Sequence, residues 1–173
     1  MVPKHLSPTR KRQAFTARQK RIFNFLKDHH VGVLSSVTPD GNPHGTVIYY
    51  AIDNDFNIHV LTKIGTRKYD NLVHNEHVMV TVYESSTQTT VQFSGFAVER
   101  AGSNNINETA NAIFAHLATD NEGLPPIMKL QAGAFTTFQL EPVQIRMAIY
   151  ARPNAGGYGE LFESIESFHL KDD

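Results

Sequence analysis

The chain has 173 residues, 40% of them hydrophobic, with no cysteine and a formal net charge of -1, which predicts a single domain with a hydrophobic core. The missing cysteines exclude disulfides, thiolate nucleophiles and cysteine-ligated metal sites, and the charge excludes a protein that is basic overall and binds nucleic acid through that charge. No apolar run approaches membrane length and no signal-peptide pattern opens the chain, so we expect a soluble, cytoplasmic protein.

The first 14 residues are polar and basic, and include the run Arg-Lys-Arg at 10–12. We predict a mobile arm or a strap across a partner subunit. Nucleic-acid or acidic-lipid binding is the alternative, but no aromatic residues that could stack interleave with the basic ones, so we expect a solvated arm. A helix should begin after Thr16, because Thr16 and Gln19 have the spacing of a capping box. Its apolar residues share one face, which should pack against the sheet: Phe15, Ile22, Phe23 and Leu26.

An antiparallel meander should follow, with strands at 31–38, 43–52 and 56–62. The turn-forming runs Pro-Asp-Gly-Asn and Asp-Asn-Asp connect them. The alternation in the third strand predicts one buried face: Phe56, Ile58, Val60 and Thr62. After a short basic loop, a helix should carry an apolar stripe of Tyr69, Leu72 and Val73. The next strand, at 77–83, should bury Val78, Val80 and Val82.

The second half of the chain continues this pattern. We predict a strand over 88–100 that bends at Gly95, a helix over 105–119, a loop over 121–126, and a strand region over 134–150 interrupted at Glu141-Pro142. Six antiparallel strands with intervening helices predict a mainly β, α+β fold, a six-stranded antiparallel split barrel. The chain then divides into a basic N-terminal arm at 1–14, a barrel domain at 15–150 and a C-terminal tail at 151–173.

The loop at 62–68 concentrates groups that bind a phosphate. Thr62 and Thr66 supply hydroxyls, and three cations accompany them: Lys63, Arg67 and Lys68. Thr66 is a good N-cap, so the next helix adds unpaired N–H donors at its positive end. An ordinary solvated basic surface is the alternative. Cations at a helix N-terminus are unfavourable by about 0.3–1 kcal/mol each unless an anion lies among them, so we predict an anion site.

This run, LTKIGTRKYDNLVHNEHVMV, resembles the phosphate-binding strand, loop and helix of the pyridoxamine 5'-phosphate oxidase-like, FMN-binding split-barrel family. The preceding SSVTPDGNPHGTVIYYAIDNDFNIHVLT resembles the family's opening hairpin and third strand. The resemblance covers roughly 31–99. It implies a split barrel of the FMN-binding type and a homodimer with two cofactor sites across its interface.

The resemblance also implies which residues hold the cofactor. FMN would place its phosphate on the strand end and loop: Leu61, Thr62, Lys63, Thr66, Arg67 and Lys68. Its ring would lie beside the backbone of the strand Thr46, Val47, Ile48 and Tyr49. Gln88, Thr90 or Gln92 of the second subunit would reach over to the cofactor. A deazaflavin would present its phosphate to the same loop, so the two cofactors stay open alternatives.

The histidines provide no clear metal site, because no third ligand can be placed near any pair, and we expect none. His29 and His30 end a helix, and His44 and His59 should lie on neighbouring strands. We expect each histidine to have a structural role or to be exposed to solvent. Haem is a further possible ligand because relatives of this fold bind it, although no histidine stands out as an axial ligand. No nucleophile motif indicates a hydrolase, and no catalytic residue can be named.

We therefore expect an FMN-dependent oxidoreductase acting on an unknown small molecule. The alternatives are a non-catalytic flavin or haem binder in stress response or sensing, and a basic-armed binding protein without a cofactor. We do not expect a pyridoxamine 5'-phosphate oxidase itself. The resemblance would require Arg and Lys at the ends of the strand beside the flavin, where this chain has Thr46 and Ala51. The oxidases' C-terminal segment, which carries a Trp, also has no counterpart, since the chain has no Trp.

Overall fold

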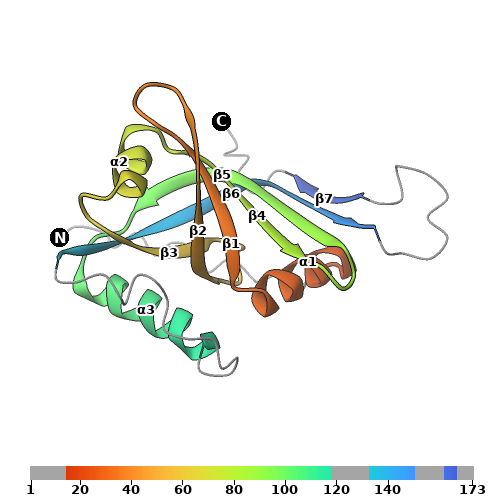
Figure 1. Cartoon of the computed structure of the whole chain (residues 1–173). Helices are drawn as coiled ribbons and strands as arrows, with labels where there is room; N and C mark the ends of the chain where they lie inside the picture. The colour runs from red at the N-terminus through yellow and green to blue at the C-terminus, as the bar shows by residue number, and fades with distance from the viewer. Residues whose placement is uncertain (1–14, 118–132, 151–161, 167–173) are drawn as a thin grey trace, which may run out of the picture.

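The computed structural model describes residues 15–117, 133–150 and 162–166. Antiparallel strands build one sheet in the order β3-β2-β1-β4-β5-β6-β7, and an additional β3–β6 pairing closes the first six into a barrel (Figure 1). The six barrel strands are β1 (Val31–Val37), β2 (Pro43–Ile52), β3 (Ile58–Lys63), β4 (His77–Glu84), β5 (Thr89–Glu99) and β6 (Phe135–Ile149). The predicted six-stranded antiparallel split barrel is confirmed. The predicted arm, the 121–126 loop and most of the tail lie outside the described residues.

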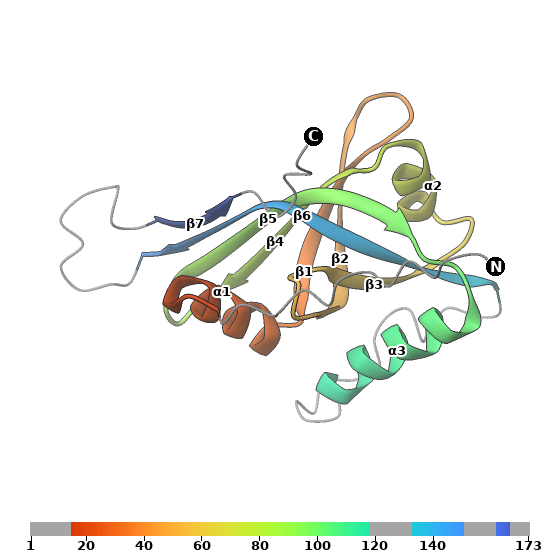
Figure 2. The ribbon, with the colours of Figure 1, turned by 180° about the vertical axis from the view of Figure 1, so that it is seen from behind.

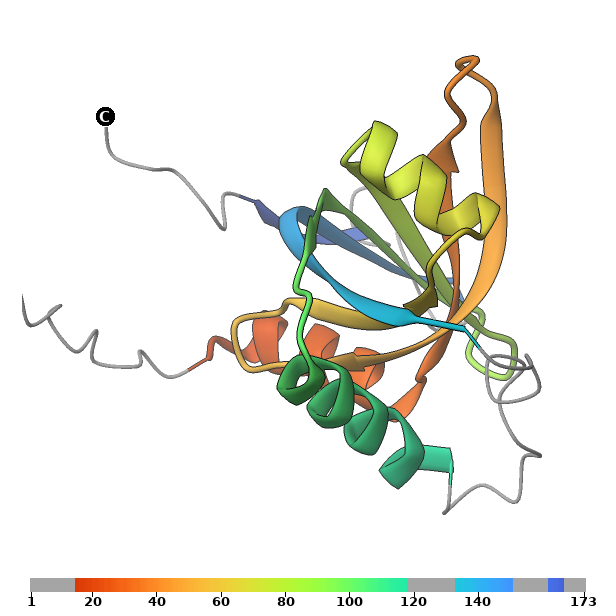
Figure 3. The ribbon, with the colours of Figure 1, turned by 90° about the vertical axis from the view of Figure 1, so that its left-hand side faces the viewer.

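Three helices accompany the barrel: α1 (Ala17–Asp28), α2 (Arg67–His74) and α3 (Ser103–Leu117). Helices α1 and α2 lie at opposite ends of the barrel, and α3 runs along its outside (Figures 1 and 3). The capping box at the start of α1 is confirmed, because the Gln19 backbone N–H donates to Thr16 Oγ1 and the Gln19 side chain accepts from the Thr16 N–H. It satisfies two N–H groups that would otherwise lack a partner.

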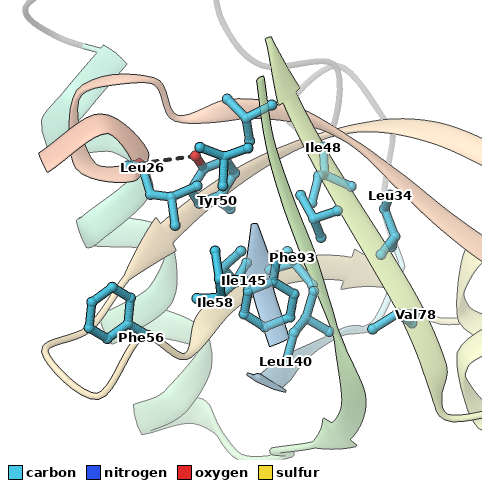
Figure 4. Packing of buried hydrophobic residues seen from close by; sticks show 14 of the residues in the cluster. Leu26, Leu34, Ile48, Tyr50, Phe56, Ile58, Val78, Phe93, Leu140 and Ile145 are labelled. Atoms are coloured by element: carbon cyan, nitrogen blue, oxygen red, sulfur yellow. Dashed lines mark hydrogen bonds between the residues drawn. The ribbon is translucent and has the colours of Figure 1, made fainter. Parts of the chain in front are cut away.

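The core fills the barrel with the inward side chains of every strand. Figure 4 shows part of it, including Ile58, Phe93, Leu140 and Ile145, which are fully buried. The faces predicted for α1, β3 and β4 are the buried or packed ones. Tyr50 anchors α1 to this core, since its buried hydroxyl donates to the Leu26 carbonyl at 2.9 Å. Burial raises the pKa of Tyr50 well above its ordinary value, so the phenol remains a neutral donor.

The strand β6 corrects the predicted interruption at Glu141-Pro142, because it runs through both residues as one element. Its register with β5 shifts between Ser94 and Gly95, which leaves Val143 of β6 as an extra residue opposite the predicted bend at Gly95. Pro142 has no backbone N–H to donate, and it is tolerated because the strand that pairs with the other edge of β6 changes from β3 to β7 at this point. Residues 135–140 pair with β3, whereas 144–148 pair with β7 (Phe162–Glu166), a strand within the predicted tail (Figure 2).

A second correction concerns the buried face of α2. Leu72 is buried and Tyr69 is half-buried, as predicted, but Val73 is exposed. Asn71 takes the buried position instead, and its Nδ2 donates to Ser36 Oγ at 3.1 Å. The helix therefore presents a polar group to the barrel end, which a search for apolar spacing does not detect.

Phe56 has a left-handed backbone, with φ of 64°, in the turn that connects β2 to β3. A bulky residue is rarely found there, because its Cβ crowds the backbone. Burial offsets this strain. The Phe56 ring packs on Phe15 and Phe23, with centroids 5.2 Å and 5.6 Å away, and the side chain is 2% exposed. The aromatic cluster thus fixes α1 to the start of β3.

We expect Phe56→Ala to destabilise the fold by about 3–5 kcal/mol, the usual cost of removing a buried phenyl group. Alanine would also keep the left-handed strain without the packing that offsets it. Urea denaturation measures the change in the free energy of unfolding. The matched control is Val73→Ala on the exposed side of α2, which should change stability by less than about 0.5 kcal/mol. Equal effects of the two substitutions would contradict the structural role of Phe56.

Candidate functional site

The barrel is split between β2 and β3. These strands pair over only three positions, Tyr50 with Val60, Ala51 with His59 and Ile52 with Ile58. Beyond Tyr50, the remaining residues of β2 stay paired with β1, while the end of β3 follows β6. The two strands therefore diverge, and a cavity of about 320 Å³ lies beside the gap.

The edge of β2 that faces the gap carries backbone groups without a strand partner in the described part of the chain. Residues 43–49 pair with β1 on one side only. In an antiparallel strand, successive N–H and C=O groups point alternately to the two edges. A flat ligand with donors and acceptors on its rim can therefore hydrogen-bond to this edge. The predicted ring-binding residues all line the cavity: Thr46, Val47, Ile48 and Tyr49.

The loop between β3 and α2 forms the cationic end of the cavity. Gly65 has φ of 79°, which lets the chain turn directly after β3. Thr66 is the N-cap of α2, as predicted, and its hydroxyl also donates to the Lys63 carbonyl at 2.8 Å. The predicted residues of this segment that line the cavity are Leu61, Lys63, Thr66, Arg67 and Lys68. Cationic side chains and the positive end of a helix thus meet at one place.

Lys68 is a half-buried cation of the cavity. Its Nζ donates to the Leu61 carbonyl at 3.5 Å, and burial lowers its pKa to about 8. Removal from water disfavours the ammonium form, and among the described residues no carboxylate side chain lines the cavity to compensate for this cost. An anion bound beside Lys68 would stabilise the ammonium and raise its pKa again. Lys68 is therefore charged near pH 7, and the part of the cavity wall that the structure describes supplies no counter-ion.

Gly133 lies directly against the Lys63 side chain. A Cβ atom at residue 133 would lie 2.3 Å from Lys63 Cε, well inside van der Waals contact. The two segments are also joined by a 2.9 Å hydrogen bond from the Ile64 N–H to the Ala134 carbonyl. The glycine therefore leaves room for the lysine stem at the wall of the cavity.

Helix α3 supplies an apolar wall that the sequence did not assign to the site. Ala110, Ile113 and Phe114 line the cavity from the outer side of the β2–β3 gap. Ile113 also packs with Ala51 in a small second hydrophobic cluster. The apolar stripe of α3 was visible in the sequence, but its spacing only indicates packing, because the sheet face it covers is set by tertiary structure.

His44 also lines the cavity and was not predicted to do so. Its Nδ1 is buried and has no hydrogen-bond partner. The signal that could have found it is the period of two along β2, since His44 shares a face with Thr46 and Ile48, which were assigned to the site. His59, on β3, does not line the cavity, and its Nε2 instead lies 2.9 Å from a carboxylate oxygen of Asp53 in the β2–β3 turn.

Four predicted site residues do not line this cavity. Thr62 points into the barrel and is fully buried, and its hydroxyl has no partner. The other three, Gln88, Thr90 and Gln92, lie at or on β5, away from the β2–β3 gap. Thr90 and Gln92 alternate with the buried Val91 and therefore face outward.

The described residues contain no group of three or more His, Cys, Asp or Glu side chains that could hold a metal ion. His29 is a helix cap, as its position indicated, because its Nδ1 lies 2.9 Å from the Phe25 carbonyl. Within the part of the chain that the structure describes, no helix has the length and hydropathy needed to cross a membrane.

We expect Thr62→Val to leave stability unchanged or to raise it by about 1 kcal/mol. The two side chains have nearly the same shape, and the buried Thr62 hydroxyl is unsatisfied, as is that of Thr136, which pairs with Thr62 across β3 and β6. Thermal unfolding measures the effect. Thr66→Val is the control, and it should destabilise because it removes the N-cap of α2. A large loss of stability in Thr62→Val would reveal a hydrogen bond to this hydroxyl.

Comparisons with known proteins agree with this architecture. Several solved structures share the fold at low identity. A haem-binding protein from Mycobacterium smegmatis is 16% identical with a TM-score of 0.64, and the match covers 89% of this chain but only 60% of that one. A pyridoxamine 5'-phosphate oxidase-related, FMN-binding protein from Nostoc punctiforme is 13% identical with a TM-score of 0.56, over 88% of this chain and 98% of that one.

General Stress Protein 26 from Bacillus anthracis is 20% identical with a TM-score of 0.55, and the match covers 74% of this chain and 91% of that one. No curated protein sequence matches the chain. The model of the family described as pyridoxamine 5'-phosphate oxidase matches residues 19–146, which is most of the chain. The sequence resemblance is thereby confirmed, and the chain belongs to the pyridoxamine 5'-phosphate oxidase-like family.

Proposed function

We propose that this protein binds FMN in the β2–β3 gap and acts as an oxidoreductase on a small molecule. The observation that carries the proposal is the composition of the cavity. It joins an unpaired strand edge, an apolar helix wall and a cluster of cations at a helix N-terminus. Its volume of about 320 Å³ falls within the range of roughly 300–1,000 Å³ that ligand pockets occupy.

The residues present fit the parts of FMN. Arg67, Lys68 and Thr66 offer charge-assisted hydrogen bonds for a phosphate, and Lys63 adds a further positive charge. The free edge of 46–49 offers backbone N–H and C=O groups for the polar rim of the ring. When bound, FMN would supply the redox chemistry, while the chain contributes position and electrostatics. The Nostoc punctiforme relative, described as FMN-binding, supports this choice.

Oxidation of pyridoxamine 5'-phosphate is not part of the proposal. A second phosphate in a buried site needs its own cation. Thr46 brings no charge to the cavity, and Ala51 is covered by α3, so neither position presents a basic group to a substrate. The substrate therefore remains an unidentified small molecule.

A non-catalytic binder of flavin or haem, acting in stress response or sensing, is the second candidate. Relatives described as a haem-binding protein and a general stress protein support it, and His44 places an imidazole in the cavity. A metal-ligating histidine almost always donates its other ring N–H to a carbonyl or carboxylate. The buried Nδ1 of His44 has no such partner, which favours flavin over axial ligation of haem.

Titration with FMN tests the proposal directly, by flavin fluorescence and by thermal shift of the protein. At a hundredfold excess over its dissociation constant, FMN should stabilise the protein by about 2.7 kcal/mol. Absence of both signals would refute FMN binding. Oxidation of a reduced nicotinamide by the FMN-loaded protein would support the oxidoreductase over the non-catalytic binder, and a Soret band after haem addition would support the haem alternative.

We expect Arg67→Ala to weaken FMN binding by about 1.5–3 kcal/mol, because it removes a hydrogen bond to a charged group. Riboflavin lacks the phosphate and should bind weakly to the parent and almost equally weakly to the variant. Fluorescence titrations of both ligands measure the difference. Thr62→Val is the matched control and should keep the parent's affinity for FMN, since Thr62 does not line the cavity. Equal FMN affinity in Arg67→Ala and the parent would place the phosphate elsewhere.

We further propose a homodimer that covers the outer face of β1, β2 and β4. This face carries exposed apolar side chains: Val33, Val47, Met79 and Tyr83. It is continuous across the sheet, because Val33 pairs with Val47 on one side and with Thr81 on the other, and Thr81 pairs with Gln92. Val47 is 61% exposed and also lines the cavity, so a partner seated here would close the cavity as well.

The same face explains the proposed role of the β5 residues. In a two-fold interface each contact occurs twice, with the roles of the subunits exchanged. Because Gln92 and Val47 share the face, Gln92 of the partner subunit could approach the cavity beside Val47. Thr90, the adjacent outward residue on β5, and Gln88 just before it would accompany Gln92.

We expect Val33→Asp to shift the protein to a monomer and to weaken FMN binding. A charge buried in an interface without a partner costs about 2–5 kcal/mol, and Val33 does not itself line the cavity. Light scattering at micromolar concentration measures the mass. The control is Val73→Asp, an exposed valine on α2 outside this face, which should stay dimeric. A parent protein with the mass of one chain would refute the homodimer.

A further inference from the structure

Helix α3 turns an apolar face toward the cavity and leaves part of that face uncovered. The helix lies against β2, β3 and β6 (Figure 3). Ala110, Ile113 and Phe114 line the cavity, and their spacing puts them on one side of the helix. Ile113 is buried and packs with Ala51, whereas Phe114 is only half-buried. Ile113 therefore anchors α3 to the barrel, and Phe114 keeps apolar surface that a ligand can cover.

A second aromatic side chain stands on the opposite wall. Tyr49 of β2 lines the cavity, is half-buried, and packs against the same small cluster of Ala51 and Ile113 as Phe114 does. The two rings thus border one space between a strand and a helix. Aromatic rings attract each other in stacked or edge-to-face arrangements beyond the gain from buried area, so a flat aromatic ligand suits this space.

The free edge of β2 decides between an aromatic and an aliphatic ligand. Residues 46–49 have no strand partner on this edge in the described part of the chain. An alkyl chain beside it would bury N–H and C=O groups without partners, which is unfavourable. A sugar would satisfy these groups but would leave the Phe114 ring uncovered. A heteroaromatic ring meets both walls, because its rim carries donors and acceptors and its faces are apolar.

The end of β3 joins this apolar section of the cavity to the cationic one. Leu61 packs against the small cluster, and Lys63 follows it by two residues, next to Thr66 and Arg67 of the loop and α2. All four residues line the same cavity, so one ligand can occupy both sections. Such a ligand has an anionic group at one end and a heteroaromatic ring at the other.

We propose that Phe114 is a specificity-determining residue of the cavity, which stacks on the heteroaromatic part of a phosphate monoester while the β2 edge bonds to the rim of that ring. The inference rests on the proposed function when the monoester is FMN. It goes further by assigning the selection of the ring to α3. Phosphate monoesters without such a ring are then held by the cations alone.

The first test compares phosphate monoesters on the parent protein by calorimetric titration. FMN and adenosine 5'-phosphate carry a heteroaromatic ring, whereas ribose 5-phosphate does not. We expect at least one of the ring-bearing esters to bind about tenfold more tightly than ribose 5-phosphate, a usual gain from stacking one base. If neither binds more tightly than ribose 5-phosphate, the inference is overturned. If adenosine 5'-phosphate does so but FMN does not bind, the proposed function fails and the role of α3 stands.

The second test assigns the preference to Phe114. Phe114→Leu keeps an apolar side chain but removes the ring, and it should weaken binding of the ring-bearing ester about fivefold without changing the affinity for ribose 5-phosphate. Phe114→Tyr keeps the ring and should stay within about twofold of the parent. Asn111→Ala, on the exposed side of α3, is the matched control and should leave every affinity unchanged. An unchanged affinity in Phe114→Leu, or equal losses for all the esters, would overturn the inference.

Discussion

The short pairing between β2 and β3 determines where everything else in the site lies. A backbone edge in a barrel must find hydrogen-bond partners, and β3 finds them on β6 over its whole length. Beyond Val60, β3 therefore follows β6, while β2 continues along β1 as far as the hairpin. The gap that results leaves part of the β2 edge available to a ligand. The divergence also places the end of β3, and therefore the turn at Gly65 and the N-cap Thr66 of α2, beside this gap.

The cationic end of the cavity is stabilised by contacts that do not involve charge pairing. Thr66 caps α2 and bonds back to Lys63, and Asn71 ties the helix to Ser36 at the end of β1. These neutral hydrogen bonds hold the loop in place although its cations repel each other and oppose the helix dipole. In the proposed function, an anion bound among these cations would relieve this local electrostatic cost, as is common at binding sites.

Sequence alone predicted the parts of the site that depend on neighbours along the chain. Each of these parts has a signal in adjacent residues: the end of β3, the N-cap at Thr66 and the cations at 63–68. The structure brings them together with β2. The contributions of α3 and His44 were missed because they depend on which sheet face a distant helix covers and on where a strand loses its partner. Val73 was wrongly predicted to be buried for a related reason: the barrel end under α2 takes the polar Asn71 instead, which periodicity cannot reveal.

Lys68 shows how binding and stability are coupled in this arrangement. Its pKa in the folded chain is about 8, below the ordinary value of 10.5, so the folded state disfavours the ammonium form relative to the unfolded state. This penalty is fully present below pH 8 and is lost as the pH rises from 8 toward 10.5. It amounts to a few kcal/mol at most, by the usual conversion of about 1.4 kcal/mol per pKa unit. A bound anion removes the same penalty at neutral pH, because it replaces the water that the ammonium lost. In the proposed anion complex, part of the binding free energy would therefore be the release of a cost that Lys68 already bears in the free protein.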